Sequence, residues 1–181
     1  HAFGQSFWYD NIRRQFLLEG EVRRLIDEDG LRGMTSNPTI FDQALKGSAD
    51  YDAEIRTRLQ QGQSGEALFF ELALADLTRA ADLFLPVHQR TRGVDGWVSL
   101  EVSPLLADDA AKTIAAAARL HARAARPNLF IKIPGTPAGI TAIEESIFAG
   151  VPINVTLLFS CPQDGAAADA YLRGIERRIA A

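Results

Sequence analysis

Asn128-Leu129-Phe130-Ile131-Lys132-Ile133-Pro134-Gly135 is the stretch that decides the fold of this 181-residue chain. It is a short apolar run bounded by Pro127 and by Pro134-Gly135, and it predicts a buried strand over 129–134. Strands of a parallel sheet are covered on both faces, so they need not alternate between apolar and polar residues. A lysine in the middle of such a run requires an explanation.

Lys132 has the residue type and the surroundings of a Schiff-base nucleophile. Burial opposes the ammonium form of a lysine, so a desolvated lysine tends towards the neutral, nucleophilic amine. The chain has 19 lysines and arginines, of which only Lys46, Lys112 and Lys132 are lysines, and a guanidinium cannot form an imine. The alternative is a structural lysine that extends along the strand end to water.

Predicted strands alternate with helices along the chain. The strands are expected at 7–10, 31–37, 97–103, 129–134 and 153–159. The main helices are expected at 48–90 with a break near 62–65, and at 108–125, 137–148 and 164–181. This alternation predicts parallel βαβ units, which build either a doubly wound sheet or a (β/α) barrel. Neither GxGxxG nor GxxxxGK[ST] follows any strand, so the nucleotide-binding doubly wound alternative loses its main support.

Nearly every predicted strand carries polar residues suited to a barrel site, which favours the barrel. In a barrel, catalytic groups collect near the carboxyl ends of several strands. The residues concerned are Asp10, Thr35, Asn37, Glu101, Lys132, Asn154 and Thr156. Each has a structural alternative, since Asp10 or Asn37 could serve a helix cap or turn, and Asn154 with Thr156 could bond the local backbone.

Composition and charge narrow the function class. The formal net charge of -4, without a cluster of basic residues, argues against a nucleic-acid binder. Cys161 is the only cysteine, which fits a reducing compartment and predicts a cytoplasmic location. No HExxH or paired-histidine spacing suggests a metal, and no apolar run reaches the ~18 residues of a membrane span. His1 in place of methionine suggests an N-terminus that is cut back from the gene product.

Two longer motifs resemble signatures of the transaldolase family. Gly33-Met34-Thr35-Ser36-Asn37-Pro38-Thr39-Ile40-Phe41 is similar to the first signature. Ile131-Lys132-Ile133-Pro134-Gly135-Thr136-Pro137-Ala138-Gly139-Ile140 is similar to the Schiff-base lysine signature. The segments 8–10, 99–104 and 153–160 resemble the family's other active-site strands, in the family's order.

The resemblance implies an α/β fold of the (β/α)8 TIM-barrel type, present here as an incomplete barrel of about five strands. A closed barrel has eight strands and typically about 250 residues. Residues 1–181 would then be the N-terminal portion of the domain, with the remainder of the barrel in the same or another chain. The resemblance places the phosphate-binding residues on the later strands, and some relatives are fused to a glucose-6-phosphate isomerase domain.

The resemblance further implies a cofactor-free transfer of a dihydroxyacetone unit between sugar phosphates, as in the pentose phosphate pathway. The donor would be fructose 6-phosphate or sedoheptulose 7-phosphate, and the acceptor an aldose phosphate. The implied catalytic residues are Lys132 as nucleophile, Asp10 as the base for carbon-carbon cleavage, and Glu101 with Thr156 as the proton shuttle. Asn37 and Asn154 would bind donor hydroxyls, and Thr35 and Ser36 would line the same mouth.

Two alternatives stay open at this point. The enzyme could be a related fructose-6-phosphate aldolase that releases the three-carbon unit instead of transferring it. Alternatively, the chain could be a non-catalytic half-barrel that only assembles with a partner. We expect the 181 residues alone to be inactive.

Overall fold

The computed structural model describes residues 3–181, and its elements alternate as the sequence predicts. The strands are β1 (Trp8–Asp10), β2 (Gly33–Thr35), β3 (Trp97–Glu101), β4 (Leu129–Pro134) and β5 (Ile153–Thr156). Before β3 lie the helices α1 (Arg14–Leu18), α2 (Glu21–Asp27), α3 (Pro38–Lys46), α4 (Asp52–Gln60) and α5 (Gly65–Arg90). After β3 come the 3-10 turn η1 (Pro104–Leu106) and the helices α6 (Ala110–Ala124), α7 (Pro137–Phe148) and α8 (Cys161–Ala180).

The strands form one five-stranded sheet in the order β1-β2-β3-β4-β5. The pairs β1/β2, β2/β3 and β4/β5 are parallel. A sheet that adds its strands in one direction follows the path of a (β/α) barrel, whereas a doubly wound sheet reverses its strand order. The predicted α/β class with five parallel strands is therefore confirmed, and it corresponds to part of a barrel.

The chain divides into two compact units. The first contains His1–Leu100 and Arg126–Asn128, and the second contains Glu101–Ala125 and Leu129–Ala181.

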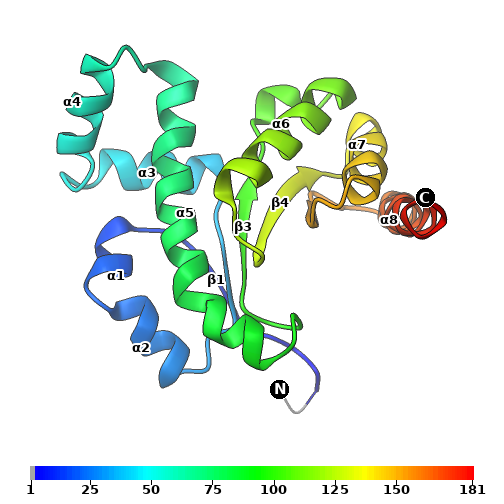
Figure 1. Cartoon of the computed structure of the whole chain (residues 1–181), viewed down its shortest axis with the longest axis horizontal. Coiled ribbons are helices and arrows are strands. Elements are labelled where there is room, and N and C mark those ends of the chain that lie inside the picture. Colours follow the sequence, from blue (N-terminus) through cyan, green and yellow to red (C-terminus); the bar gives the residue numbers. More distant parts are fainter. Residues whose placement is uncertain (1–2) are drawn as a thin grey trace. The chain divides into compact units, whose positions relative to one another are not determined.

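Helix α5 supplies the core of the first unit. Its fully buried residues Leu77, Ala80, Phe84 and Val87 recur every three or four positions, which is the pattern of an amphipathic helix. Helices α1, α2 and α4 contact α5, and Figure 1 shows α1 and α2 (blue) beside it (green). The helical segment predicted for 48–90 is thus present as α4 and α5, with a break near the predicted position.

The second unit has α7 packed against both α6 and α8 (Figure 1). Strand β4 has the predicted bounds, and Leu129, Ile131 and Ile133 on one of its faces are completely buried. Helix α7 also has its predicted bounds. The Thr136 hydroxyl caps it by accepting a hydrogen bond from the Gly139 backbone N–H at 3.0 Å, and proline follows at the first helical position.

Several element boundaries differ from the sequence predictions; the strand expected at 97–103, for example, ends at Glu101. Of the strand expected at 31–37, only β2 forms. It is followed by helix α3, which was not predicted. Asn37 caps this helix, because its side-chain oxygen accepts a hydrogen bond from the Ile40 N–H at 2.9 Å. The strand expected at 153–159 ends at Thr156, because Leu157 takes a left-handed backbone conformation with φ of 60°. Helix α8 begins earlier than residue 164, since the Ser160 hydroxyl caps it.

Gly139 of α7 lies against the Pro134 carbonyl at the end of β4, and we expect Gly139→Ala to destabilise the fold. A Cβ there would overlap the carbonyl oxygen of Pro134, and backbone cannot move aside cheaply. The free energy of unfolding, measured by urea denaturation, should fall by about 1–3 kcal/mol. Gly165→Ala is the matched control, because nothing lies within 4 Å of its new Cβ. That helical substitution should instead stabilise by about 0.5–1 kcal/mol, and equal effects at both sites would contradict the packing argument.

Candidate active site

Lys132 and Glu101 form an ion pair inside the second unit. The Lys132 Nζ lies 3.3 Å from the Glu101 Oε2, and the two side chains are only 13% and 14% exposed. Glu101 is the last residue of β3, and the backbone N–H of Val102 donates to the carbonyl of Lys132 at 3.1 Å. The amine predicted from the apolar run is thus nearly buried, and it has one carboxylate as its neighbour.

Strand β5 adds two of the predicted polar residues beside this pair. In the parallel register, Asn154 is aligned with Lys132 and Thr156 with Pro134. Aligned residues project to the same face of a sheet, so Lys132, Asn154 and Thr156 share one face of β4 and β5. The backbone N–H of Gly135 donates to the Thr156 carbonyl at 2.8 Å, which fixes the two strand ends together. The second unit therefore brings together Lys132, Glu101, Asn154 and Thr156.

The other predicted site residues lie in the first unit. Asp10 ends β1, is exposed, and is aligned with Thr35 of β2. The Thr35 hydroxyl is buried without a hydrogen-bond partner among the residues described. Ser36 is buried, at 3% exposure. The side-chain oxygen of Asn37 caps α3, which is the structural role considered for it, and its NH2 group could donate to a substrate.

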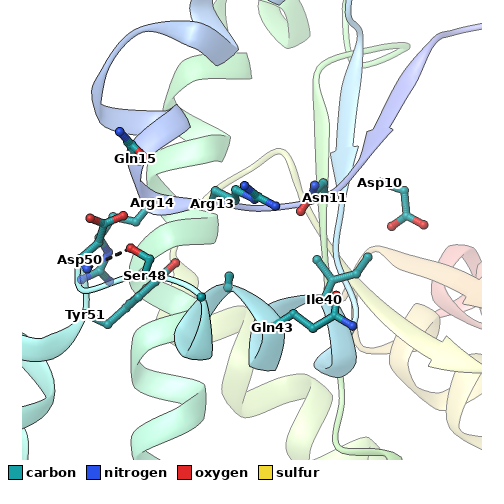
Figure 2. Close-up of a pocket in the computed structure, with 12 residues that line it drawn as sticks. Asp10, Asn11, Arg13, Arg14, Gln15, Ile40, Gln43, Ser48, Asp50 and Tyr51 are labelled. Atoms are coloured by element: carbon teal, nitrogen blue, oxygen red, sulfur yellow. Dashed lines mark hydrogen bonds between the residues drawn. The ribbon is translucent and has the colours of Figure 1, made fainter.

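A pocket of about 370 Å³ opens beside Asp10 in the first unit. Its walls are the end of β1 and the loop after it, the start of α1, one side of α3 and the loop between α3 and α4. Figure 2 shows Asp10 at one end of this pocket and Arg14, Ser48 and Tyr51 at the other. The lining residues are Asp10, Asn11, Arg13, Arg14, Gln15, Ile40, Gln43, Ala44, Gly47, Ser48, Asp50 and Tyr51. Most are polar, so the pocket offers both donors and acceptors next to a carboxylate.

Arg14 anchors the segment that carries Asp10 onto the first unit's core. Its Nε donates to the Asp76 carboxylate of α5 at 2.8 Å, and its Nη1 donates to Glu54 of α4 at 2.7 Å. The Tyr51 hydroxyl donates to the other Asp76 oxygen at 2.8 Å, and the guanidinium lies 4.3 Å from the Tyr51 ring centre. This network joins α1, α4 and α5. Its central residue, Arg14, follows Asp10 by four residues in the sequence.

Burial and charge oppose each other in this network. Burial alone would lower the pKa of Arg14, but the neighbouring carboxylates Asp76 and Glu54 raise it above its usual value. Burial raises the pKa of Asp76 against the opposing pull of Arg14. Burial and the Asp76 charge also raise the pKa of Tyr51. The pair therefore adds little net stability, whereas the loss of one partner would leave the other charge buried and uncompensated.

The sequence predictions missed this network, although one signal was available. Asp76 falls on the buried stripe of α5, between Leu72 and Ala80, where an aspartate needs a cationic partner.

Within residues 3–181 no three His, Cys, Asp or Glu side chains gather as a metal site. None of the helices described is long and apolar enough to span a membrane.

Comparison with known proteins identifies relatives of the whole chain. The family model described as Transaldolase/Fructose-6-phosphate aldolase matches residues 7–181. The chain is 43% identical over 177 residues to "Transaldolase" of Trichodesmium erythraeum, covering 98% of this chain and 47% of that protein. It is 44% identical over 180 residues to "Transaldolase" of Neisseria gonorrhoeae, covering 99% and 51%. It is 41% identical over 178 residues to "Transaldolase 2" of Nostoc punctiforme, covering 98% and 47%. The chain thus spans about half the length of these curated relatives.

We expect Asp76→Asn to destabilise the first unit strongly, because the buried Arg14 guanidinium loses its fully buried counter-charge and keeps the partly exposed Glu54 carboxylate. Removing one partner of a buried ion pair typically costs about 3–5 kcal/mol. The free energy of unfolding from chemical denaturation measures the effect.

Asp82→Asn on the same helix is the control for that measurement. Asp82 pairs with Arg126 at 2.6 Å, but the two side chains are 52% and 34% exposed. An exposed pair contributes about 1 kcal/mol at most. A similar loss for both variants would show that burial of the Arg14 pair is not what matters.

Proposed function

The chain belongs to the transaldolase/fructose-6-phosphate aldolase family, and from this premise we propose that it supplies the catalytic lysine of a transaldolase. The proposed reaction moves a dihydroxyacetone unit from fructose 6-phosphate or sedoheptulose 7-phosphate to an aldose phosphate. No cofactor is required, because the lysine itself supplies the electron sink. The names of its relatives support a transaldolase-type function for the family member. The single cysteine supports a reducing compartment such as the cytoplasm as its location.

The observation that carries the proposal is the ion pair between Lys132 and Glu101. A Schiff-base cycle needs an amine and a group that moves protons to and from it. The 3.3 Å separation puts the carboxylate within reach of the amine, and the low exposure of both side chains keeps water from competing. Asn154, aligned with Lys132, is a polar neighbour on the same face of the sheet.

Imine formation uses the groups of the second unit. Glu101 accepts a proton from the Lys132 ammonium, and the resulting amine attacks the ketose carbonyl carbon. The carbinolamine that forms loses its hydroxyl as water when Glu101 returns the proton, and the nitrogen lone pair then forms the iminium. Thr156 orients the water that leaves here and that attacks when the product is released. The carboxylate ends each half-cycle ionised, so protons balance.

Cleavage uses a second carboxylate, Asp10. It removes the proton from the hydroxyl on the carbon that is cut from the donor. The carbon-carbon bond breaks, its electrons flow into the iminium, and an enamine of the three-carbon unit stays on Lys132. The enamine carbon then attacks the aldehyde of the acceptor, and Asp10 returns its proton to the oxygen of that aldehyde. Two carboxylates in different surroundings suit separate acid and base tasks, and Asp10 is exposed whereas Glu101 is nearly buried.

The remaining predicted residues bind and orient the substrate. Asn154 and the amide group of Asn37 would hydrogen-bond the donor hydroxyls. Thr35 has a buried hydroxyl without a partner in the described part of the chain, which supports a place in the mouth of the site. Ser36 follows it at the same strand end.

The remaining strands of the barrel would complete the site. Strand β5 is the last strand of the sheet, so its outer edge is unpaired in the part of the chain described. We propose that further strands, from the same or another chain, pair with this edge and carry the phosphate-binding residues. Some relatives of this type are fused to a glucose-6-phosphate isomerase domain, which is a candidate partner domain. Without them, we expect residues 1–181 to be inactive.

A fructose-6-phosphate aldolase reaction is the second candidate, because the family description includes that activity. The two reactions share the enamine on Lys132 and differ in whether an aldose or a proton captures it. A product assay with and without erythrose 4-phosphate separates them. Turnover that requires the acceptor supports transfer, and dihydroxyacetone release without it supports the aldolase.

We expect borohydride with fructose 6-phosphate to attach one three-carbon adduct to Lys132 of the full-length protein. Lys46 and Lys112 should stay unmodified, because their side chains are 75% and 72% exposed and are not enclosed by an apolar strand as Lys132 is. Peptide mapping by mass spectrometry locates the adduct. Lys132→Arg should keep the fold and abolish turnover, because it keeps the charge but cannot form an imine. An adduct on another lysine would contradict the assignment.

Glu101→Gln and Asp10→Asn should block different steps. Glu101→Gln is expected to leave substrate binding nearly intact and to slow imine formation by about 10² to 10⁴, the usual contribution of a general acid-base group. Asp10→Asn should let the Schiff base form and accumulate, because only the later cleavage lacks its base. Rapid-quench trapping with borohydride measures both rates. If both variants trapped adduct at the wild-type rate, the separate roles would be wrong.

A further inference from the structure

The side-chain amide of Gln163 ties together the two loops that follow β4 and β5. Its Nε2 donates to the carbonyl of Gly135 at 2.7 Å and to the carbonyl of Leu157 at 2.9 Å. Its Oε1 accepts from the backbone N–H of Phe159 at 2.9 Å. Both amide hydrogens are therefore used, and each reaches a different loop.

These two loops begin directly beside the proposed chemistry. Gly135 comes three residues after Lys132, and Leu157 comes directly after Thr156. The Gly135 N–H donates to the Thr156 carbonyl, while the Gly135 carbonyl accepts from Gln163. The ends of β4 and β5 are thus held together in two ways. The Gly135 N–H bonds the end of β5 directly, and the Gln163 side chain bonds the residue that follows each strand.

The backbone at Leu157 explains why such a tie is needed. Leu157 has a φ of 60°, a left-handed conformation that is unfavourable for a leucine. Conformations of this kind persist only where the surroundings impose them, and they cluster at functional sites. The hydrogen bond from Gln163 holds the carbonyl of this very residue. The turn that ends β5 immediately after Thr156 is therefore fixed by a side chain of α8.

Helix capping alone does not account for these bonds. Gln163 is the third residue of α8, and its backbone N–H donates to the Ser160 hydroxyl at 3.3 Å, as in a capping box. In that motif the side chain of the third residue returns to the backbone at the helix start, for which an acceptor oxygen suffices. The two donor bonds, to Gly135 and Leu157, point away from the helix to the ends of the strands. A glutamate would serve the helix equally well but could not make them when ionised.

We propose that Gln163 is a positioning residue for the reaction, which sets the Thr156 hydroxyl relative to Lys132. The inference rests on the proposed function, because it takes Lys132 as the nucleophile and Thr156 as the residue that orients water. Misplacement of a reacting group by about 1 Å can cost as much as 10²-fold in rate. The loss should therefore appear in imine formation and in product release, and less in substrate affinity.

Gln163→Glu in the full-length protein is the first test. The start of α8 should be retained, since glutamate is equally suited to that position. Imine formation, followed by borohydride trapping, should slow by about 10- to 10²-fold, with a much smaller change in KM. The introduced carboxylate faces the carbonyl oxygens of Gly135 and Leu157. When it is protonated, it can donate a hydrogen bond to one of these carbonyls; when it is ionised, it can donate to neither. The deficit relative to wild type should therefore shrink as the pH falls from about 7 to about 5.

Gln163→Met and Ser160→Ala are the matched variants. Gln163→Met removes the donors without adding charge, so its rate should fall similarly but without the extra pH dependence. Hydrogen exchange of the Gly135 amide should accelerate in both Gln163 variants, which gives a readout besides activity. Ser160→Ala removes the helix cap and lowers thermal stability, yet imine formation should change less than about twofold.

The outcomes separate the two hypotheses. If the wild-type protein forms no adduct at Lys132, the proposed function fails, and the role of Gln163 fails with it. If the wild type forms the adduct and both Gln163 variants form it at the same rate, only the positioning role is refuted. An equal slowing by Ser160→Ala would likewise refute it, because the effect would then belong to the helix start.

Discussion

A buried cation must have a buried counter-charge, and both units of this protein are organised around that constraint. In the second unit Lys132 lies 3.3 Å from Glu101, and in the first unit Arg14 lies 2.8 Å from Asp76. In each pair the partners come from elements far apart in the sequence. Because an unpaired charge in either place would be expensive, each pair fixes how its elements meet.

The two pairs differ in what they can do chemically. A guanidinium stays protonated and binds carboxylates through a rigid planar fork, so Arg14 with Asp76, Glu54 and Tyr51 forms a structural network. An ammonium can give up its proton, and the Glu101 carboxylate lies at a longer distance, 3.3 Å, from Lys132. The first pair therefore stabilises the support of Asp10, whereas the second is suited to proton transfer.

The sequence alone predicts those parts of the fold that local residues determine. Strand β4 and helix α7 have their predicted bounds because Pro127, Pro134-Gly135 and the Thr136 cap mark their ends within the segment itself. Glu101 ends β3 beside Lys132, and the parallel register of β4 and β5 aligns Asn154 with Lys132. The end of β5 was not predictable in this way, because Leu157 is held by Gln163 of the next helix. Helix α3 lies outside the sequence predictions, because a proline after a strand pattern is compatible both with a turn and with the first position of a helix, and the Asn37 cap decides for the helix.

The division into two units separates the proposed groups for imine formation from the proposed base for carbon-carbon cleavage. The groups for imine formation, Lys132, Glu101 and Thr156, belong to the second unit, where hydrogen bonds from Gly135 and Gln163 fix the strand ends. The base for cleavage, Asp10, belongs to the first unit, where Arg14 fixes the segment that follows it. Each chemical step thus depends on a different set of supporting contacts. A change in the support of one unit should disturb its own step first, because hydrogen bonds and ion pairs act over a few ångströms and each set is closed within its unit.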